Sequence, residues 1–143
     1  MVAQAVATVA ALYRFPVKSM GGESLERVQL QWHGLDVDRG FVFVKAGSLA
    51  RFPWLTARDL PDLVRYRAYL TDHANTRKSP VLVQTPTGEI LPVESDALRE
   101  SLERQVDGPL QLLHPDTPAV RAHFGDTAVP RCTSPKIARL GTD

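Results

Sequence analysis

Hydrophobic and polar residues along this chain form short runs, most of which have the two-residue period of β-strands. The clearest runs lie at 9–17, 23–32, 41–45, 64–70, 81–85, 89–93 and 110–113. In the second run, Val28, Leu30 and Trp32 alternate with polar residues, which predicts one half-buried face. The run at 41–45 is continuously apolar and is predicted to be buried on both faces. Residues 86–88, Pro-Thr-Gly, separate two of the runs and predict a hairpin.

One helix is predicted at 97–106, because Leu98, Leu102 and Val106 recur every fourth residue behind a cap at Ser95 or Asp96. A single helical turn is expected at 59–63, with Asp59 as its cap. Crossover helices for a parallel sheet are not apparent. The predicted fold is therefore mostly β: a small antiparallel β-barrel or sandwich of about six or seven strands with one helix.

The composition suits a globular domain, with 143 residues of which 43% are hydrophobic and 23% charged. A net charge of +1 gives no general attraction to nucleic acid or to a membrane. The single cysteine, Cys132, excludes an intramolecular disulfide and fits a reducing compartment, so a cytoplasmic location is expected. The apolar residues 2–12 lack a basic region and continue into the first strand, so they are interpreted as part of it and not as an export signal.

Lys18 and Ser19 follow the first apolar run and precede Gly21 and Gly22. A cation, a hydroxyl and glycine backbone N–H groups at the end of a strand are typical of a site for an anion such as phosphate. The alternative is a solvated lysine after a strand. The order of glycine and lysine does not match the P-loop of nucleotide-binding proteins.

Two arginines have comparable positions. Arg39 lies directly before the apolar run at 41–45, where its guanidinium could bind an oxyanion while Asp38 holds it; a surface ion pair with Asp38 is the alternative. Arg58 ends an extended segment before the predicted helical turn, and the alternative for it is a pair with Asp59 or Asp62.

Together these segments resemble the N-terminal β-barrel domain of MOSC proteins, the group that includes the C-terminal part of molybdenum-cofactor sulfurase and the amidoxime-reducing enzymes. The resemblance rests on Phe-Pro-Val-Lys-Ser at 15–19, Gly-Leu at 34–35 followed by Asp-Arg at 38–39, and Leu-Thr-Ala-Arg at 55–58 before Pro61. It covers about residues 9–113, with the three motifs in the family's order and spacing.

The resemblance implies a molybdenum cofactor, with its molybdopterin between this barrel and a following MOSC domain. Cofactor contacts carry over to Lys18, Ser19 and Arg39, and less directly to Arg58. Complete relatives would be reductases of N-hydroxylated compounds or sulfur carriers, whose molybdenum-ligating cysteine belongs to the MOSC domain. Cys132 does not match that cysteine, so no catalytic or metal-binding residue is assigned, and activity of this chain alone is not expected.

The expected domains are a barrel at 1–113 and an irregular tail at 114–143 that opens an incomplete MOSC domain. The tail contains four prolines, and its segment 124–130 resembles the start of that domain. The rest of the cradle could come from a MOSC domain in trans or from a homodimer. The alternative function is a non-catalytic interaction module that pairs with another chain or with itself.

Overall fold

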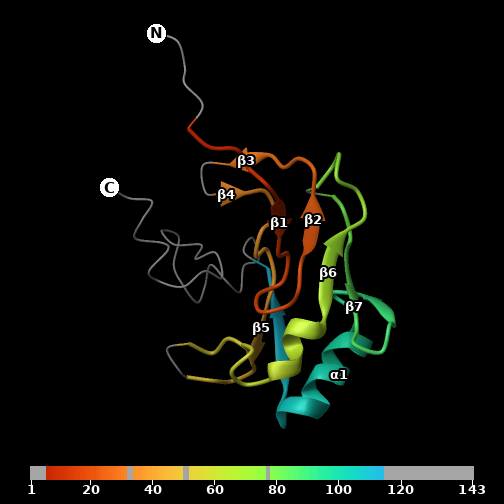
Figure 1. Ribbon diagram of the computed structural model, residues 1–143. Coiled ribbons are helices and arrows are strands. Elements are labelled where there is room, and N and C mark those ends of the chain that lie inside the picture. Colours follow the sequence, from red (N-terminus) through yellow and green to blue (C-terminus); the bar gives the residue numbers. More distant parts are fainter. Residues whose placement is uncertain (1–5, 32–33, 50–51, 77, 115–143) are drawn as a thin grey trace.

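The computed structural model describes residues 6–31, 34–49, 52–76 and 78–114 (Figure 1). Those residues are mostly β and contain one α-helix, which confirms the predicted fold class. In chain order the elements are β1 (Leu12–Arg14), β2 (Glu23–Leu25), β3 (Leu30–Gln31), β4 (Gly34–Leu35), β5 (Val42–Lys45), the 3-10 helix η1 (Pro61–Arg65), β6 (Arg67–Leu70), β7 (Val81–Gln84), β8 (Ile90–Pro92), α1 (Asp96–Val106) and β9 (Leu110–Leu113).

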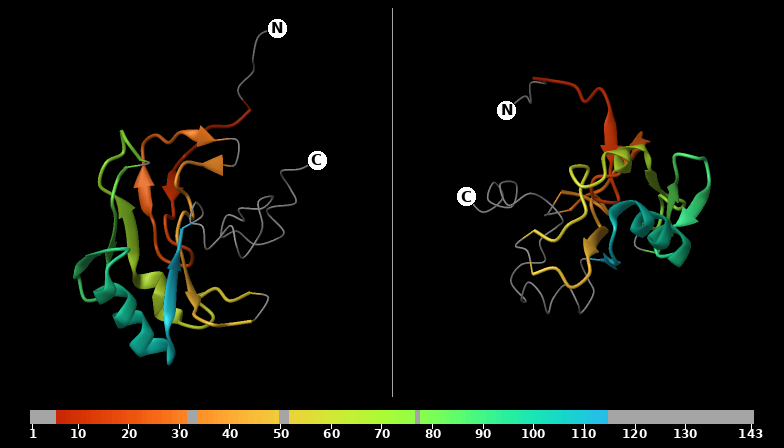
Figure 2. Two further views of the ribbon diagram at one scale, coloured as in Figure 1. Left: turned by 180° about the vertical axis from the view of Figure 1, so that it is seen from behind. Right: turned by 90° about the horizontal axis from the view of Figure 1, so that it is seen from below.

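The strands pair into four small antiparallel sheets, β1–β2, β3–β4, β5–β9 and β6–β7–β8, and not into one closed barrel. Three isolated bridges lie outside these strand pairings: Val17 with Phe41, Gly21 with Arg67, and Val44 with Trp54. The β3–β4 hairpin lies at one end of the molecule, and α1 lies at the other end, beside β9 (Figures 1 and 2).

The strand β5 contacts the core on both of its faces, as its continuous apolar sequence predicts. Phe43, like Phe41 just before the strand, belongs to the main hydrophobic core, which also includes Leu98 and Leu102 of α1. Val42 and Val44 point the other way and form a second cluster with Leu113, against which Trp54 packs. Successive side chains of a strand point to opposite faces, so this one short strand serves both clusters.

The helix α1 begins where the sequence predicts. The Ser95 hydroxyl oxygen accepts a hydrogen bond from the Leu98 N–H at 3.3 Å, so Ser95 is the cap. At the other end, Asp107 adopts a left-handed conformation before Gly108 and Pro109 lead into β9. Within the residues that the structure describes, no helix has the length and apolarity needed to cross a membrane.

A buried ion pair joins β1 and β2. Arg14 and Glu23 face each other in the sheet register and are 2% and 5% exposed. Nε of Arg14 donates a hydrogen bond to Oε1 of Glu23 at 2.8 Å, and Nη2 lies 2.8 Å from the same oxygen without the geometry of a hydrogen bond. The Leu70 N–H donates to that oxygen at 3.3 Å, which connects the pair to β6. Sequence reasoning missed this pair, although a charged residue inside the apolar run at 9–17 was a signal.

Four predicted elements differ in the structure. The first run, predicted as a strand at 9–17 and extended back over residues 2–12, is a strand only at Leu12–Arg14, and residues 6–11 belong to no strand. The run at 23–32 is divided into β2 and β3, and Leu30 is 74% exposed, so the buried face predicted for it is wrong there; Trp32 lies outside the described residues. The run at 64–70 is a strand only from Arg67, because η1 takes its first two residues. The N-cap of η1 is Leu60, and no side chain caps it.

Glu23→Gln is expected to cost about 3–5 kcal/mol of unfolding free energy, because it leaves the buried Arg14 guanidinium without a counter-charge. Glu26→Gln is the matched control, since Glu26 is exposed one residue after the same strand, and its change is expected to stay within about 0.5 kcal/mol. Urea unfolding of both variants measures the difference. Equal stability of the two variants would contradict a structural role for the pair.

Candidate anion-binding site

The backbone brings the first two sequence motifs side by side. The Phe41 N–H donates to the Pro16 carbonyl at 3.0 Å, and the Lys18 N–H donates to the Phe41 carbonyl at 2.9 Å, which forms a parallel bridge. Two residues before Phe41, the Arg39 N–H donates to the Phe15 carbonyl at 2.7 Å. Residues 15–18 therefore lie along residues 39–41, although the two segments are more than 20 positions apart in the chain.

Lys18 and Ser19 occupy the two central positions of a tight turn. The Met20 N–H closes this turn by donating to the Val17 carbonyl at 3.3 Å. Ser19 has a φ of 64°, in the left-handed region that a turn of this kind usually fills with glycine. The turn thus places an ammonium-bearing residue and a hydroxyl-bearing residue next to each other.

Asp38 holds both motifs through its two carboxylate oxygens. Oδ1 accepts a hydrogen bond from the Phe15 N–H at 2.8 Å, and Oδ2 pairs with Nη1 of Arg39. The Arg39 guanidinium also lies over the Phe15 ring, 5.5 Å from its centroid, at a distance typical of a cation–π contact. The predicted Asp38–Arg39 pair is therefore present, and it is more than a surface ion pair because it includes the first motif.

The glycines after Ser19 serve the fold. The Gly21 N–H donates to the Tyr66 carbonyl at 2.7 Å, so the expectation that this amide would face an anion is wrong. A Cβ at Gly22 would lie 2.2 Å from the Arg14 carbonyl oxygen, which explains the absence of a side chain there. Both residues bring β2 close to its neighbours.

Arg58 lies in a separate turn. Asp59 organises this turn by accepting hydrogen bonds from the N–H and the hydroxyl of Thr56, at 3.1 and 2.9 Å. Asp59 itself pairs with Lys45 at 2.5 Å and Asp62 with Arg65, and among the described residues Arg58 forms an ion pair with neither aspartate, so that alternative is wrong. None of the contacts described for Arg58 joins it to Lys18, Ser19 or Arg39.

His114 is a residue of this region that the sequence analysis did not assign. Its ring lies edge-on to that of Phe41, with 4.7 Å between the centroids. The pairing of Val42 with Leu113 explains this contact, because one further step along both strands brings His114 beside Phe41. A histidine directly after a buried strand was the only signal in the sequence. The contact places the end of β9 at the edge where the two motifs meet.

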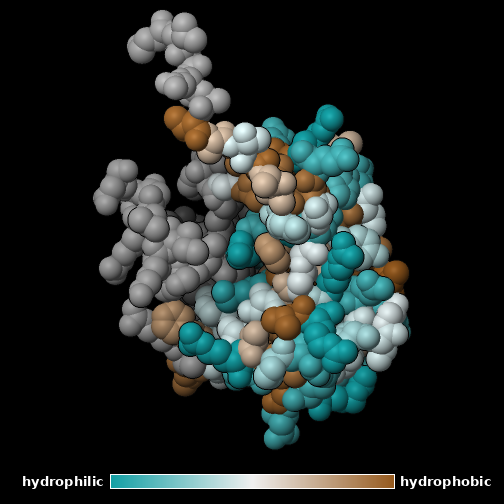
Figure 3. Space-filling model, in the orientation of Figure 1, coloured by the Kyte–Doolittle hydropathy of each residue, from teal (hydrophilic) through white to brown (hydrophobic). Residues whose placement is uncertain are grey.

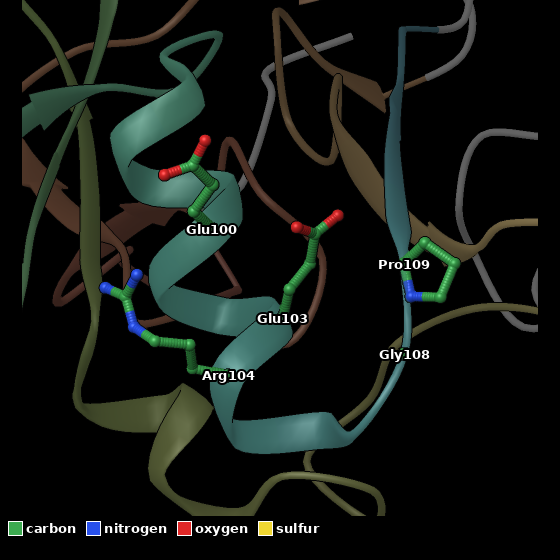
Figure 4. Close-up of a pocket in the computed structure, with 5 residues that line it drawn as sticks. All are labelled: Glu100, Glu103, Arg104, Gly108 and Pro109. Atoms are coloured by element: carbon green, nitrogen blue, oxygen red, sulfur yellow. The ribbon is translucent and has the colours of Figure 1, made fainter.

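A shallow pocket of about 420 Å³ lies elsewhere, between the last turns of α1 and the residues before β9 (Figure 4). It is lined by Glu100, Glu103, Arg104, Gly108 and Pro109, none of which belongs to the motifs. Glu103 has a structural task there, because it accepts a hydrogen bond from the Leu110 N–H at 2.8 Å. That bond, with the contribution of Arg99, lowers the pKa of the Glu103 carboxyl. The pocket therefore lies where α1 and β9 are joined.

A family model described as the MOSC N-terminal beta barrel domain matches residues 6–117. This chain belongs to that MOSC family. No curated protein and no solved structure matches the chain. The match confirms the resemblance that the three motifs carry, and the chain is a MOSC-family protein.

The described part of this MOSC barrel holds no group of three or more His, Cys, Asp or Glu side chains suited to a metal ion. Cys132 and all of the predicted tail at 114–143 except His114 lie outside the described residues. Backbone hydrogen bonds bring Lys18 and Ser19 close to Arg39. Cofactor contacts for these three residues and for Arg58 stay predictions.

Ser19→Gly is expected to leave the stability unchanged or to raise it by up to about 1 kcal/mol, because glycine adopts the left-handed conformation without steric cost. The control is Ser24→Gly, at an exposed position of β2 with ordinary strand geometry, which is expected to cost about 0.5–1 kcal/mol. Urea unfolding compares the two variants. An equal loss in both would show that Ser19 carries no conformational strain.

Asp59→Asn tests the turn that carries Arg58. The hydrogen bond from Lys45 is the main cause that lowers the pKa of the Asp59 carboxyl below its ordinary value of 3.8. A carboxyl whose pKa is lower in the folded than in the unfolded state stabilises the fold at any pH above its unfolded-state pKa. This stabilisation is lost as the pH falls through the folded-state pKa. The variant should therefore be less stable than the natural chain at pH 7, and the difference should shrink towards pH 3.

Denaturant unfolding at several pH values between 7 and 3 checks this expectation. Asp62→Asn is the control, because the Asp62 side chain is 58% exposed and lies 3.6 Å from Arg65, a surface pair of little energetic value. It should differ little from the natural chain at any pH. A deficit of Asp59→Asn that stays constant with pH would rule out the charge as its cause.

Proposed function

We propose that this MOSC barrel supplies one side of a binding site for the molybdenum cofactor, with Lys18, Ser19 and Arg39 contacting the phosphate of the pterin. Two observations support the proposal. The family is associated with this cofactor, and the hydrogen bonds of residues 15–18 with residues 39–41 bring the two cationic motifs together. The second observation carries the argument, because it does not depend on the family.

The donors of the two motifs fit a phosphate. An ammonium, a hydroxyl and a guanidinium make charge-assisted or neutral hydrogen bonds to phosphate oxygens. Asp38 is a carboxylate close to these groups, but its oxygens already bind the Phe15 N–H and Arg39. The Arg39 guanidinium carries five N–H donors, and the hydrogen bond to Asp38 uses only Nη1.

The barrel is proposed to provide the phosphate side, and a MOSC domain the remainder of the site and the molybdenum chemistry. The end of β9 supports this arrangement, because its contact with Phe41 places residue 114 at the edge where the motifs meet. A MOSC domain in trans, or a second copy of this chain in a homodimer, could close the site from there. Arg58 is proposed to have a peripheral contact at most. Complete relatives would act as reductases of N-hydroxylated compounds or as sulfur carriers.

Binding of purified molybdenum cofactor to the full chain tests the proposal. Lys18→Ala/Arg39→Ala is expected to weaken binding at least tenfold, because each charge-assisted hydrogen bond contributes about 1.5–3 kcal/mol. The matched control is Lys78→Ala/Arg104→Ala, which removes the same two charges from exposed positions. It is expected to change the affinity no more than about threefold, by loss of general electrostatic attraction.

Two results would contradict the proposal. The natural chain could fail to bind the cofactor, or the two double variants could bind it equally well. In the second case the chain would attract the cofactor only through its overall charge.

The alternative, an interaction module, has one observation in its favour. Figure 3 shows a hydrophobic group at the end of the molecule that carries β3, where Leu30 is 74% exposed, and Tyr13 of β1 is 55% exposed. Exposed apolar residues that gather on one surface are a common feature of protein contacts. Sedimentation of the purified chain discriminates: a monomer at all concentrations argues against self-association, and a dimer that Leu30→Asp dissociates supports it.

A further inference from the structure

Asp36 is a buried carboxylate that none of the predicted motifs includes as a site residue. It is 8% exposed and lies two positions before Asp38. The Thr76 hydroxyl donates a hydrogen bond to Oδ2 of Asp36. Nη1 of Arg14 donates a hydrogen bond to the Asp36 carbonyl oxygen at 3.4 Å. The Asp36 N–H donates to the Gln29 carbonyl at 3.0 Å. The carboxylate, the carbonyl oxygen and the N–H of Asp36 thus bond to three different segments of the chain.

The residues after Asp36 need such support. The Asp38 N–H donates to the Leu35 carbonyl at 3.2 Å, which closes a turn with Asp36 and Val37 at its centre. Val37 has a φ of 59° and Arg39 a φ of 53°. A β-branched residue in the left-handed region is strained, and such strain persists only where surrounding contacts enforce it. The contacts of Asp36 hold the residue before Val37, and those of Asp38 hold the residue after it.

Thr76 belongs to a loop that is itself tied to the buried ion pair. In this loop, Asp72 accepts hydrogen bonds from the N–H groups of Ala74 and Asn75, at 2.9 and 3.1 Å. Nε2 of His73 lies 3.4 Å from Oε2 of Glu23, the partner of Arg14. The loop therefore contacts two buried carboxylates, Glu23 through His73 and Asp36 through Thr76.

We propose that Thr76, Asp36 and Arg14 are positioning residues for Arg39. Thr76 and Arg14 hold Asp36, Asp36 fixes the start of the strained turn, and the turn sets where the Arg39 guanidinium lies. The part of this inference that concerns ligand affinity rests on the proposed function. The part that concerns the turn does not, because it can be measured without a ligand.

The first experiment measures amide hydrogen exchange by NMR in the full chain. Thr76→Val removes the hydroxyl and keeps the shape of the side chain, so the buried Asp36 carboxylate loses a donor. The amide of Arg39, bound to the Phe15 carbonyl, is expected to exchange at least fivefold faster. The amide of Leu55, bound to the Phe43 carbonyl, reports on global opening and should change less.

Two control variants separate positioning from general destabilisation. Thr76→Ser keeps the hydroxyl and should restore the exchange rate of the Arg39 amide. Thr87→Val removes a threonine hydroxyl that bonds to Thr85 at 2.9 Å in the turn of the β7–β8 hairpin, and should leave that rate unchanged. If Thr76→Val leaves the Arg39 amide unaffected, or accelerates Leu55 and Arg39 equally, the positioning role is refuted.

The second experiment measures binding of purified molybdenum cofactor to the same variants. Thr76→Val is expected to weaken binding about fivefold, and Thr76→Ser and Thr87→Val to bind like the natural chain. Equal binding by Thr76→Val would refute the link from Thr76 to the ligand. If the natural chain does not bind at all, the proposed function fails, and the exchange rates still decide the positioning of Arg39.

Discussion

The parallel pairing of residues 15–18 with residues 39–41 determines how this barrel presents its polar residues. Val17 and Phe41 bridge the two segments from inside the main core, where they are 0% and 7% exposed. Because these apolar partners are buried together, the backbones of Lys18, directly after Val17, and of Arg39, two residues before Phe41, lie close to each other. Burial of two hydrophobic side chains thus sets the distance between two cationic motifs.

The edge where these motifs meet combines strained backbone with dense polar contacts. Ser19, Val37 and Arg39 all have positive φ values, and three carboxylates, Glu23, Asp36 and Asp38, bind the surrounding N–H, hydroxyl and guanidinium groups. Strain of this kind is common at binding sites, where neighbouring contacts hold a loop in one geometry before the ligand arrives. Here the buried ion pair of β1 and β2 supports one side of the edge, and the Phe15 backbone supports the other.

The sequence predicts correctly those elements that are determined by residues close together in the chain. The hairpin of β7 and β8, the helix capped by Ser95 and the doubly buried β5 depend on turn residues, a cap and a continuous apolar run, and all three are confirmed. Leu30 shows the limit, because its alternating pattern does not reveal that β4 would be the one strand paired with β3 among the described residues. The positions of Lys18, Ser19 and Arg39 next to one another required the long-range pairing. The roles of Arg14, Asp36 and Thr76 required it as well, because contacts between distant segments leave no periodic trace.

The central claim is that the Lys18 ammonium and the Arg39 guanidinium face the same anion-sized space. A crystal structure of the full chain soaked with tungstate tests it most directly, because the anomalous signal of tungsten locates an oxyanion without ambiguity. The account predicts a tungstate with oxygens within about 3 Å of both Nζ of Lys18 and the Arg39 guanidinium, the distance of a charge-assisted hydrogen bond. Lys18 and Arg39 side chains on opposite faces of the barrel, with no anion between them, would contradict it.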